Sequence, residues 1–168
     1  MEHYLNFSNT NIWSEIWPEL ALALAAIVLL GIDLFRKSDK PIVSIGSLAI
    51  VFQAGLLIFH LFDYLAWHHT FDRETFSGML HQGIQGDVMR TFFLLSSLLV
   101  SVLGHQYLKN KELRAGEFHH LTMLATAGLM LLVQSNHFIM LFVALETVAV
   151  CFYTLVAYNR ESAKSLEA

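Results

Sequence analysis

The sequence is poor in cysteine, proline and charge. Its 168 residues include one cysteine and two prolines, and only 14% are charged. Cys151 alone cannot form an intrachain disulfide, so cysteine usage does not indicate a redox compartment. With 55% hydrophobic residues and a mean hydropathy of +0.53, the composition is that of an integral membrane protein rather than of a water-soluble domain.

Several sequence signatures of function are missing as well. The chain has no glycine-rich phosphate loop, no nucleotide fingerprint and no Ser/His/Asp set, so we expect no direct NADH binding. The net charge of −4 is mild and the basic residues are spread over loops, which makes nucleic acid an unexpected partner. No Lys or Arg precedes the first apolar run, whereas Glu2 and Glu15 do, so we expect no cleaved signal peptide.

Five apolar stretches reach or approach the roughly 20 residues that a helix needs to cross a bilayer. Because backbone groups in lipid must be hydrogen-bonded internally, stretches of this length are helices. The fold class is therefore all-α integral membrane, with a connection at 63–87 long enough to hold a short hairpin around Thr75–Gly78. The predicted helices cover residues 17–35, 42–62, 88–108, 118–134 and 138–158.

The basic residues predict the orientation of these helices. Eight lie in the segments after the first, third and fifth helices, and two, Arg73 and Arg90, lie on the other side. The positive-inside rule then places the N-terminus outside, loop 63–87 outside and the C-terminus in the cytoplasm. The chain is expected to stop before a sixth helix, because Asn159–Ala168 reads as a loop followed by the start of another element. The eight are Arg36, Lys37, Lys40, Lys109, Lys111, Arg114, Arg160 and Lys164.

Glu146 is the candidate functional residue, because it lies within the apolar stretch Phe138–Tyr158. An ionisable side chain at bilayer centre costs about 2.5 to 3.5 kcal/mol on insertion scales, so one that is present there usually serves an ion path or a charged partner. Tyr153 and Thr154 share its helix face and are candidates for a sparse proton relay. The alternative is that Glu146 forms one hydrogen bond in a helix interface and only stabilises packing.

The nine histidines invite a haem or metal interpretation, which their positions do not favour. The predicted topology places His60 and His105 on opposite sides of the membrane, and His119-His120 lack any recognised ligand spacing, so no metal site is expected. Asp33 lies three residues from Arg36 and is expected to pair at the membrane boundary. Small residues such as Gly128 are expected to allow close helix packing.

Several segments resemble a known family. Leu141–Glu146, Tyr153–Tyr158 and Ser165–Ala168 resemble a run shared by the antiporter-like membrane subunits of respiratory complex I, in particular the N subunit family of the bacterial enzyme. Gly116-Glu117-Phe118, Asn136 and Phe76-Ser77-Gly78 resemble the same pattern, although the family often has proline where this chain has Cys151.

The resemblance implies roles for two glutamates. Glu146 matches the family's buried glutamate, which pairs with a lysine on a later, broken helix, and Glu167 matches a second glutamate of the proton path. No lysine of this chain lies in a predicted membrane segment, so that partner is not in this sequence.

The implied function is that of a proton-translocating subunit of NADH-quinone oxidoreductase in the bacterial inner membrane. Its partners would be other membrane subunits and the lipid bilayer. It would hold no cofactor, and the flavin, iron–sulfur clusters and quinone would lie elsewhere in the complex. The alternatives are a subunit of a related sodium/proton antiporter or membrane hydrogenase, a helical assembly or scaffold protein, and a haem-bearing anchor.

Overall fold

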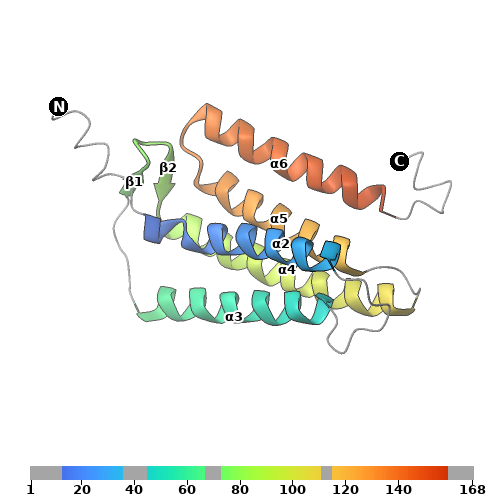
Figure 1. Ribbon diagram of the computed structural model, residues 1–168. Coiled ribbons are helices and arrows are strands. Elements are labelled where there is room, and N and C mark those ends of the chain that lie inside the picture. The colour runs from blue at the N-terminus through green and yellow to red at the C-terminus, as the bar shows by residue number, and fades with distance from the viewer. Residues whose placement is uncertain (1–12, 36–44, 67–72, 111–114, 159–168) are drawn as a thin grey trace.

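Five α-helices lie side by side in the computed structural model, which describes residues 13–35, 45–66, 73–110 and 115–158. Figure 1 shows α3 along the bottom of the bundle, α2 and α4 in the middle, α5 above them and α6 at the top. The architecture confirms an all-α, multi-pass membrane protein. The helices are α2 (Trp17–Phe35), α3 (Ile45–Ala66), α4 (Ile84–Asn110), α5 (Ala115–Gln134) and α6 (Phe138–Val156), and the one-turn 3₁₀ helix η1 (Trp13–Glu15) precedes them.

Two helices are displaced from their predicted ranges toward the long connection. The helix predicted at 42–62 occupies Ile45–Ala66, and the one predicted at 88–108 begins at Ile84. Residues 63–66 and 84–87 are therefore helical rather than parts of an external loop. The apolar pattern placed the start of α4 too late because Asp87 is polar, yet a carboxylate in the first turn of a helix is favoured by the helix dipole. Of the remaining three helices, α2 matches its predicted range, and α5 and α6 differ from theirs by three and two residues at one end, α5 starting at Ala115 and α6 ending at Val156.

The central position of α5 explains its weak hydrophobic signal. Among the described residues, four helices are long and apolar enough to cross a membrane, namely α2, α3, α4 and α6. α5 packs against α2, α4 and α6, and its buried side chains include His119, Thr126 and Gln134. A helix surrounded by other helices can carry polar groups that a lipid-facing helix would expose to hydrocarbon. The count of five spanning helices stays a prediction.

A two-stranded hairpin closes one end of the bundle, hereafter the hairpin end. β1 (Arg73–Thr75) pairs antiparallel with β2 (Leu80–Gln82), which confirms the predicted hairpin. The turn between them has positive φ at Phe76, Ser77 and Gly78. The hairpin is fastened to the turn between α5 and α6, because Asn136 N–H donates to Met79 O at 2.8 Å and its side-chain amide donates to Gly78 O at 3.2 Å.

The interior of the bundle is apolar at mid-height. Leu22 and Ala26 of α2 pack with Leu56 of α3, Leu94 of α4 and Met123 of α5, and all five are buried. Burial of these apolar side chains and the close packing of their atoms hold α2, α3, α4 and α5 together. α6 lies outside this cluster and reaches the bundle through α5.

Candidate functional site

Glu146 lies on the face of α6 that points away from the bundle. The buried residues of α6 are Ala144, Val148 and Cys151, which face α5, and Glu146 is exposed on the other side. With 3.6 residues per turn, Glu146 shares its face with exposed apolar residues such as Phe142. Within the described residues its carboxylate has no ion pair with a Lys or Arg. A carboxyl group among apolar side chains on an open helix face would be costly if that face met lipid.

The groups near Glu146 form an incomplete relay. Tyr153 is exposed on the same face, but it lies seven residues further on, about 10 Å along the axis, which is too far for a direct hydrogen bond. Thr147 and Thr154 donate to the carbonyls of Val143 and Val150 at 2.8 and 2.7 Å, so their hydroxyl hydrogens are used within α6. Glu167 lies outside the described residues.

The contact of α6 with α5 depends on Gly128. A Cβ atom at this position would lie 2.8 Å from Cγ2 of Val148 and 3.5 Å from the carbonyl oxygen of Ala144. The predicted close approach at Gly128 is therefore confirmed. It fixes which side of α6 faces inward and, in consequence, the outward direction of Glu146.

This packing predicts that Gly128→Leu disturbs the fold more than Leu131→Ala. The larger side chain would have to push α6 away, at a cost of about 1 to 3 kcal/mol or more for overpacking. Leu131 lines a cavity and is only partly buried, so its truncation removes fewer contacts. The midpoint of thermal unfolding and the yield of folded protein in detergent compare the two variants. Equal tolerance of both would show that the α5–α6 contact does not depend on Gly128.

A second polar site lies inside the hairpin end of the bundle. Arg90 of α4 donates from Nε to Oε1 of Glu19 on α2 at 2.7 Å, and both side chains are buried, at 5% and 2% exposure. Arg90 also donates from Nη1 to Oδ1 of Asp87 at 3.1 Å and from Nη2 to the carbonyl of Glu15 at 2.6 Å. The guanidinium therefore joins the start of α2 to the start of α4.

Two glutamines extend this site to α5 and to the hairpin. Gln134 at the end of α5 donates to Oε1 of Glu19 at 2.6 Å, and Gln82 of β2 donates to Oε1 of Gln134 at 2.5 Å. Gln82 also accepts from Nη1 of Arg90 at 3.1 Å. The Arg90 guanidinium is paired with two carboxylates, as a buried charge requires, whereas Oε2 of Glu19 is buried without a hydrogen-bond partner among the described residues. We call Glu19, Gln82, Asp87, Arg90 and Gln134 the Arg90 cluster.

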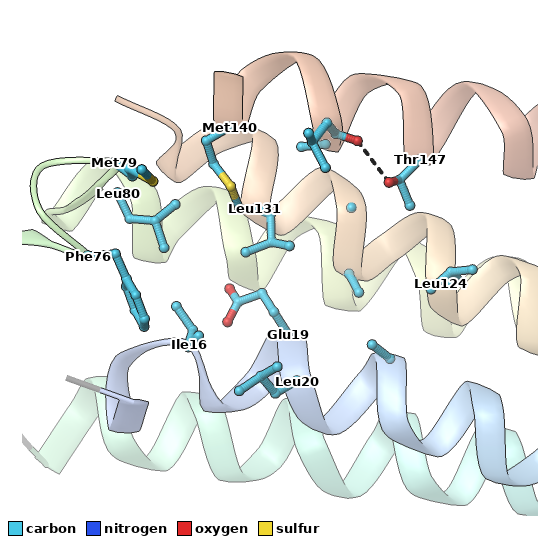
Figure 2. A pocket seen from close by; sticks show the side chains of 15 residues that line it. Ile16, Glu19, Leu20, Phe76, Met79, Leu80, Leu124, Leu131, Met140 and Thr147 are labelled. Atoms are coloured by element: carbon cyan, nitrogen blue, oxygen red, sulfur yellow. Dashed lines mark hydrogen bonds between the residues drawn. The ribbon is translucent and has the colours of Figure 1, made fainter. Parts of the chain in front are cut away.

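An apolar cavity of about 330 Å³ adjoins the Arg90 cluster (Figure 2). It lies between α2, α5, α6 and the hairpin, and Figure 2 shows the carboxyl group of Glu19 pointing from α2 into this space. Its other walls are mainly Leu, Met, Ile, Phe and Ala side chains, including Leu20, Phe76 and Leu131. Because these walls offer almost no hydrogen-bonding groups, the cavity suits apolar groups and is no route for ions.

Comparison with known proteins finds similar sequences. The chain is 40% identical to NADH-quinone oxidoreductase subunit N 1 of Opitutus terrae over the whole of this chain and 33% of that protein. It is 36% identical to subunit N of Xanthomonas euvesicatoria over 90% of this chain and 30% of that protein. It is 30% identical to subunit N of Methylovorus glucosotrophus over 98% of this chain and 33% of that protein. The chain is thus similar to NADH-quinone oxidoreductase subunit N proteins over nearly its whole length.

The resemblance read from the sequence is thus confirmed. The chain spans about a third of the length of the curated subunit N proteins that it matches. No protein-family model matches it.

The Arg90 cluster was missed from the sequence. Glu19 lies in the first turn of α2 beside Trp17, which is typical of a membrane boundary, and Arg90 was counted with the external loop. Glu19 and Arg90 are 71 residues apart, so no local spacing connects them. One feature of the sequence could have indicated a buried partner for Arg90. This residue lies between Val88 and the apolar run that begins at Phe92, where an unpaired guanidinium would be costly.

The histidines among the described residues lie at the two ends of the bundle. Nε2 of His60 is 3.5 Å from the carbonyl oxygen of Asp87 at the hairpin end, whereas the ring of His105 lies 5.6 Å from the ring of His119 at the opposite end. His60 and His105 thus lie too far apart to ligate one haem. The described residues contain no group of three or more His, Cys, Asp or Glu that could hold a metal ion.

Asp33 meets α5 at the same end as His105. Its carboxylate lies directly against Gly116, where a Cβ atom would overlap it, while Arg36, its predicted partner, lies outside the described residues. Tyr158 lies just beyond α6 near Glu117 and Asp33. Burial raises the pKa of the Tyr158 phenol, and these two carboxylates raise it further. The ends of α2, α5 and α6 are therefore close together here.

Proposed function

We propose that this chain is part of a proton-translocating membrane subunit of NADH-quinone oxidoreductase and that Glu146 takes part in moving the proton. The observation that carries the proposal is the position of Glu146, a carboxyl group in the apolar α6, on the face that α5 does not cover. The subunit N names of the relatives support the assignment to this complex.

The proposed mechanism is electrostatic. A carboxyl group in a low-dielectric setting binds a proton when no cation is close and releases it when a cation approaches. The cation would be a lysine of the remainder of the subunit, brought nearer to Glu146 or moved away from it when quinone is reduced elsewhere in the complex. Tyr153, on the same face, would hold a water molecule between itself and Glu146, and Glu167 would continue the path.

No cofactor is proposed for this chain. The flavin, iron–sulfur clusters and quinone belong to other parts of the complex, and the chain's partners are other membrane subunits and lipid. The proposed location is the bacterial inner membrane.

Isolation of the complete protein distinguishes the complex from its alternatives. Tagged full-length protein purified from its native membrane in mild detergent should carry flavin and NADH:quinone reductase activity with it. An antiporter subunit would purify without flavin, and a hydrogenase subunit would purify with hydrogen-evolving activity. Either result would contradict the assignment to NADH-quinone oxidoreductase.

The orientation follows from the basic residues and agrees with the helix packing. Contacts between Asp33 and Gly116, and between His105 and His119, place the ends of α2 and α4 and the start of α5 at one end of the bundle. We propose that this end faces the cytoplasm and that the hairpin end faces outward.

Cysteine labelling tests this orientation. Lys40→Cys and Lys111→Cys should react only with a membrane-impermeant reagent applied from the cytoplasmic side, and Thr70→Cys only from the outer side. The measurement compares intact cells with inverted vesicles. Labelling of Lys40→Cys and Thr70→Cys from the same side would contradict the proposed topology.

A further inference from the structure

Several buried polar side chains of α3, α4 and α5 have no hydrogen-bond partner among the described residues. They include both polar atoms of the Gln53 amide, the hydroxyls of Ser97 and Ser101, Nδ1 of His105 and both ring nitrogens of His119. Gln53, Ser101 and His119 have 0% exposure. An unsatisfied buried polar group costs about 1 to 3 kcal/mol, so a group of five such side chains calls for additional partners.

These side chains are aligned along the bundle. On α4, Ser97, Ser101 and His105 follow one another at intervals of four residues and therefore lie on one face. On α3, Gly46 and Gln53 are seven residues apart and are both buried. The imidazoles of His105 and His119 meet at Gly46, where a Cβ atom would overlap Nδ1 of one ring and Nε2 of the other. We call these five side chains, Gln53, Ser97, Ser101, His105 and His119, the α4 polar row.

The spacing within the α4 polar row suits bridging water. Successive positions on α4 are about 6 Å apart along the helix axis, which is too long for a direct hydrogen bond. Two hydrogen bonds of about 2.8 Å, one on each side of a water molecule, cover nearly the same distance. Serine hydroxyls and neutral imidazoles both donate and accept, as a chain of proton transfers requires.

The α4 polar row points toward the Arg90 cluster and ends about two helical turns from it, because Ser97 and Arg90 are seven residues apart. On α4, Leu94 lies between Ser97 and Arg90; on α3, Leu56 lies between Gln53 and His60. Leu94 and Leu56 are 1% and 7% exposed and belong to the same apolar cluster. Beyond them, His60 approaches Asp87, which is bonded to Arg90. Polar groups thus run along the bundle from both ends, with one apolar layer between them.

We propose that the interior of α3, α4 and α5 is a second, water-filled proton pathway, separate from Glu146 and closed by Leu56 and Leu94. The class of ligand is water and the excess proton it carries. An apolar constriction of this kind blocks conduction by excluding water and opens when it becomes wetted. The pathway goes beyond the role proposed for Glu146, because none of its groups lies on α6.

Leu94→Ser in the complete subunit, assembled in its complex and reconstituted into vesicles, tests the pathway. A hydroxyl in the constriction should admit water and accelerate passive proton entry by about tenfold, which corresponds to a barrier lower by about 1.4 kcal/mol. The measurement is the decay of an imposed pH gradient, with a membrane potential clamped by potassium and valinomycin and without electron transfer. Leu95→Ser is the matched control, since Leu95 is the next residue on α4 and is 54% exposed.

Two further variants identify the route. Gln53→Leu or Ser101→Ala, added to Leu94→Ser, should remove the leak because each deletes a group of the α4 polar row, whereas Glu146→Gln added to Leu94→Ser should leave it unchanged. A leak that is equal in Leu95→Ser, or that survives Gln53→Leu, would overturn the pathway. So would an assembled Leu94→Ser complex without any leak. None of these outcomes bears on pumping through Glu146, so the two proposals fail separately.

A measurement on the unaltered complex remains decisive if Leu94→Ser does not assemble. A cryo-electron microscopy map that resolves water should show ordered water molecules bridging Ser97, Ser101 and His105 and none between Leu56 and Leu94. A dry row, with the five side chains bonded directly to one another, would overturn the proposal.

Discussion

Replacing Glu146 with glutamine should lower the number of protons moved per electron in reconstituted vesicles while the complex still assembles. Glutamine has nearly the same size and keeps a hydrogen bond, but it cannot release a proton at any relevant pH. A positioned acid or base contributes on the order of 10²- to 10⁴-fold to a proton-transfer step, so transfer through this subunit should effectively stop. Electron transfer should slow as well because the two are coupled, so proton uptake must be divided by electron flux.

Two variants sharpen this experiment. Glu146→Asp keeps a carboxyl group on a shorter side chain and should retain part of the pumping. Glu117→Gln makes the same chemical change at an exposed position in the first turn of α5 and should leave the ratio unchanged. If Glu146 only stabilised packing, the glutamine variant would pump normally and any loss would follow the amount of assembled complex. A wild-type proton gradient at wild-type flux in Glu146→Gln vesicles would remove the case for transport.

Removing the cation of the Arg90 cluster should destabilise the subunit severely. Arg90→Met leaves Glu19 with an uncompensated buried carboxylate and removes the four hydrogen bonds that Arg90 donates, and breaking a buried pair in this way costs about 3 to 5 kcal/mol. The expected result is a large fall in the thermal unfolding midpoint and in the amount of assembled complex. The effect should be larger than that of any single apolar truncation on α6, which packs on α5 alone.

The double variant Glu19→Leu with Arg90→Met separates the ion pair from the space it fills. Because the charge of Glu19 is gone as well, the only carboxylate left without its partner is that of Asp87, which is 25% exposed and can reach water, so much of the lost stability should return. An Arg90→Met protein with an unchanged midpoint would show that the pair does not hold α2 to α4. A double variant as unstable as the single one would place the loss in the hydrogen bonds to Gln82 and Gln134 instead.

Local patterns predicted the parts of the structure that local forces determine. The range of α2 matched at both ends, and the hairpin was found at the turn residues that permit it. The end of α3 and the start of α4 lie beyond the predicted bounds because hydropathy marks where the side chains stop being apolar, whereas a helix continues as long as its backbone hydrogen bonds are made. Arg90 was placed at the outer edge of its predicted helix, and only the folded structure shows that Glu19 lies against it.

The α4 polar row illustrates a different limit. Ser97, Ser101 and Gln53 are individually ordinary residues for a membrane helix, and small polar side chains there usually serve packing. Their alignment becomes visible only when α3 and α4 are placed face to face. Glu146 is the opposite case, because its rarity in an apolar helix singled it out from the sequence, and the described residues do not supply its partner. Its role therefore stays a prediction.

The fastening of the hairpin has a practical consequence for labelling the protein. Exposed turns usually accept insertions, yet this one is bonded through Met79 and Gly78 to Asn136, and the ring of Phe76 packs edge-on against Trp13 at 5.4 Å. A tag inserted between Phe76 and Met79 would have to break those contacts and pull on Gln82, which is bonded to Arg90. Such a tag would report the damage it causes to the ends of α4 and α5, not the side of the membrane on which it lies.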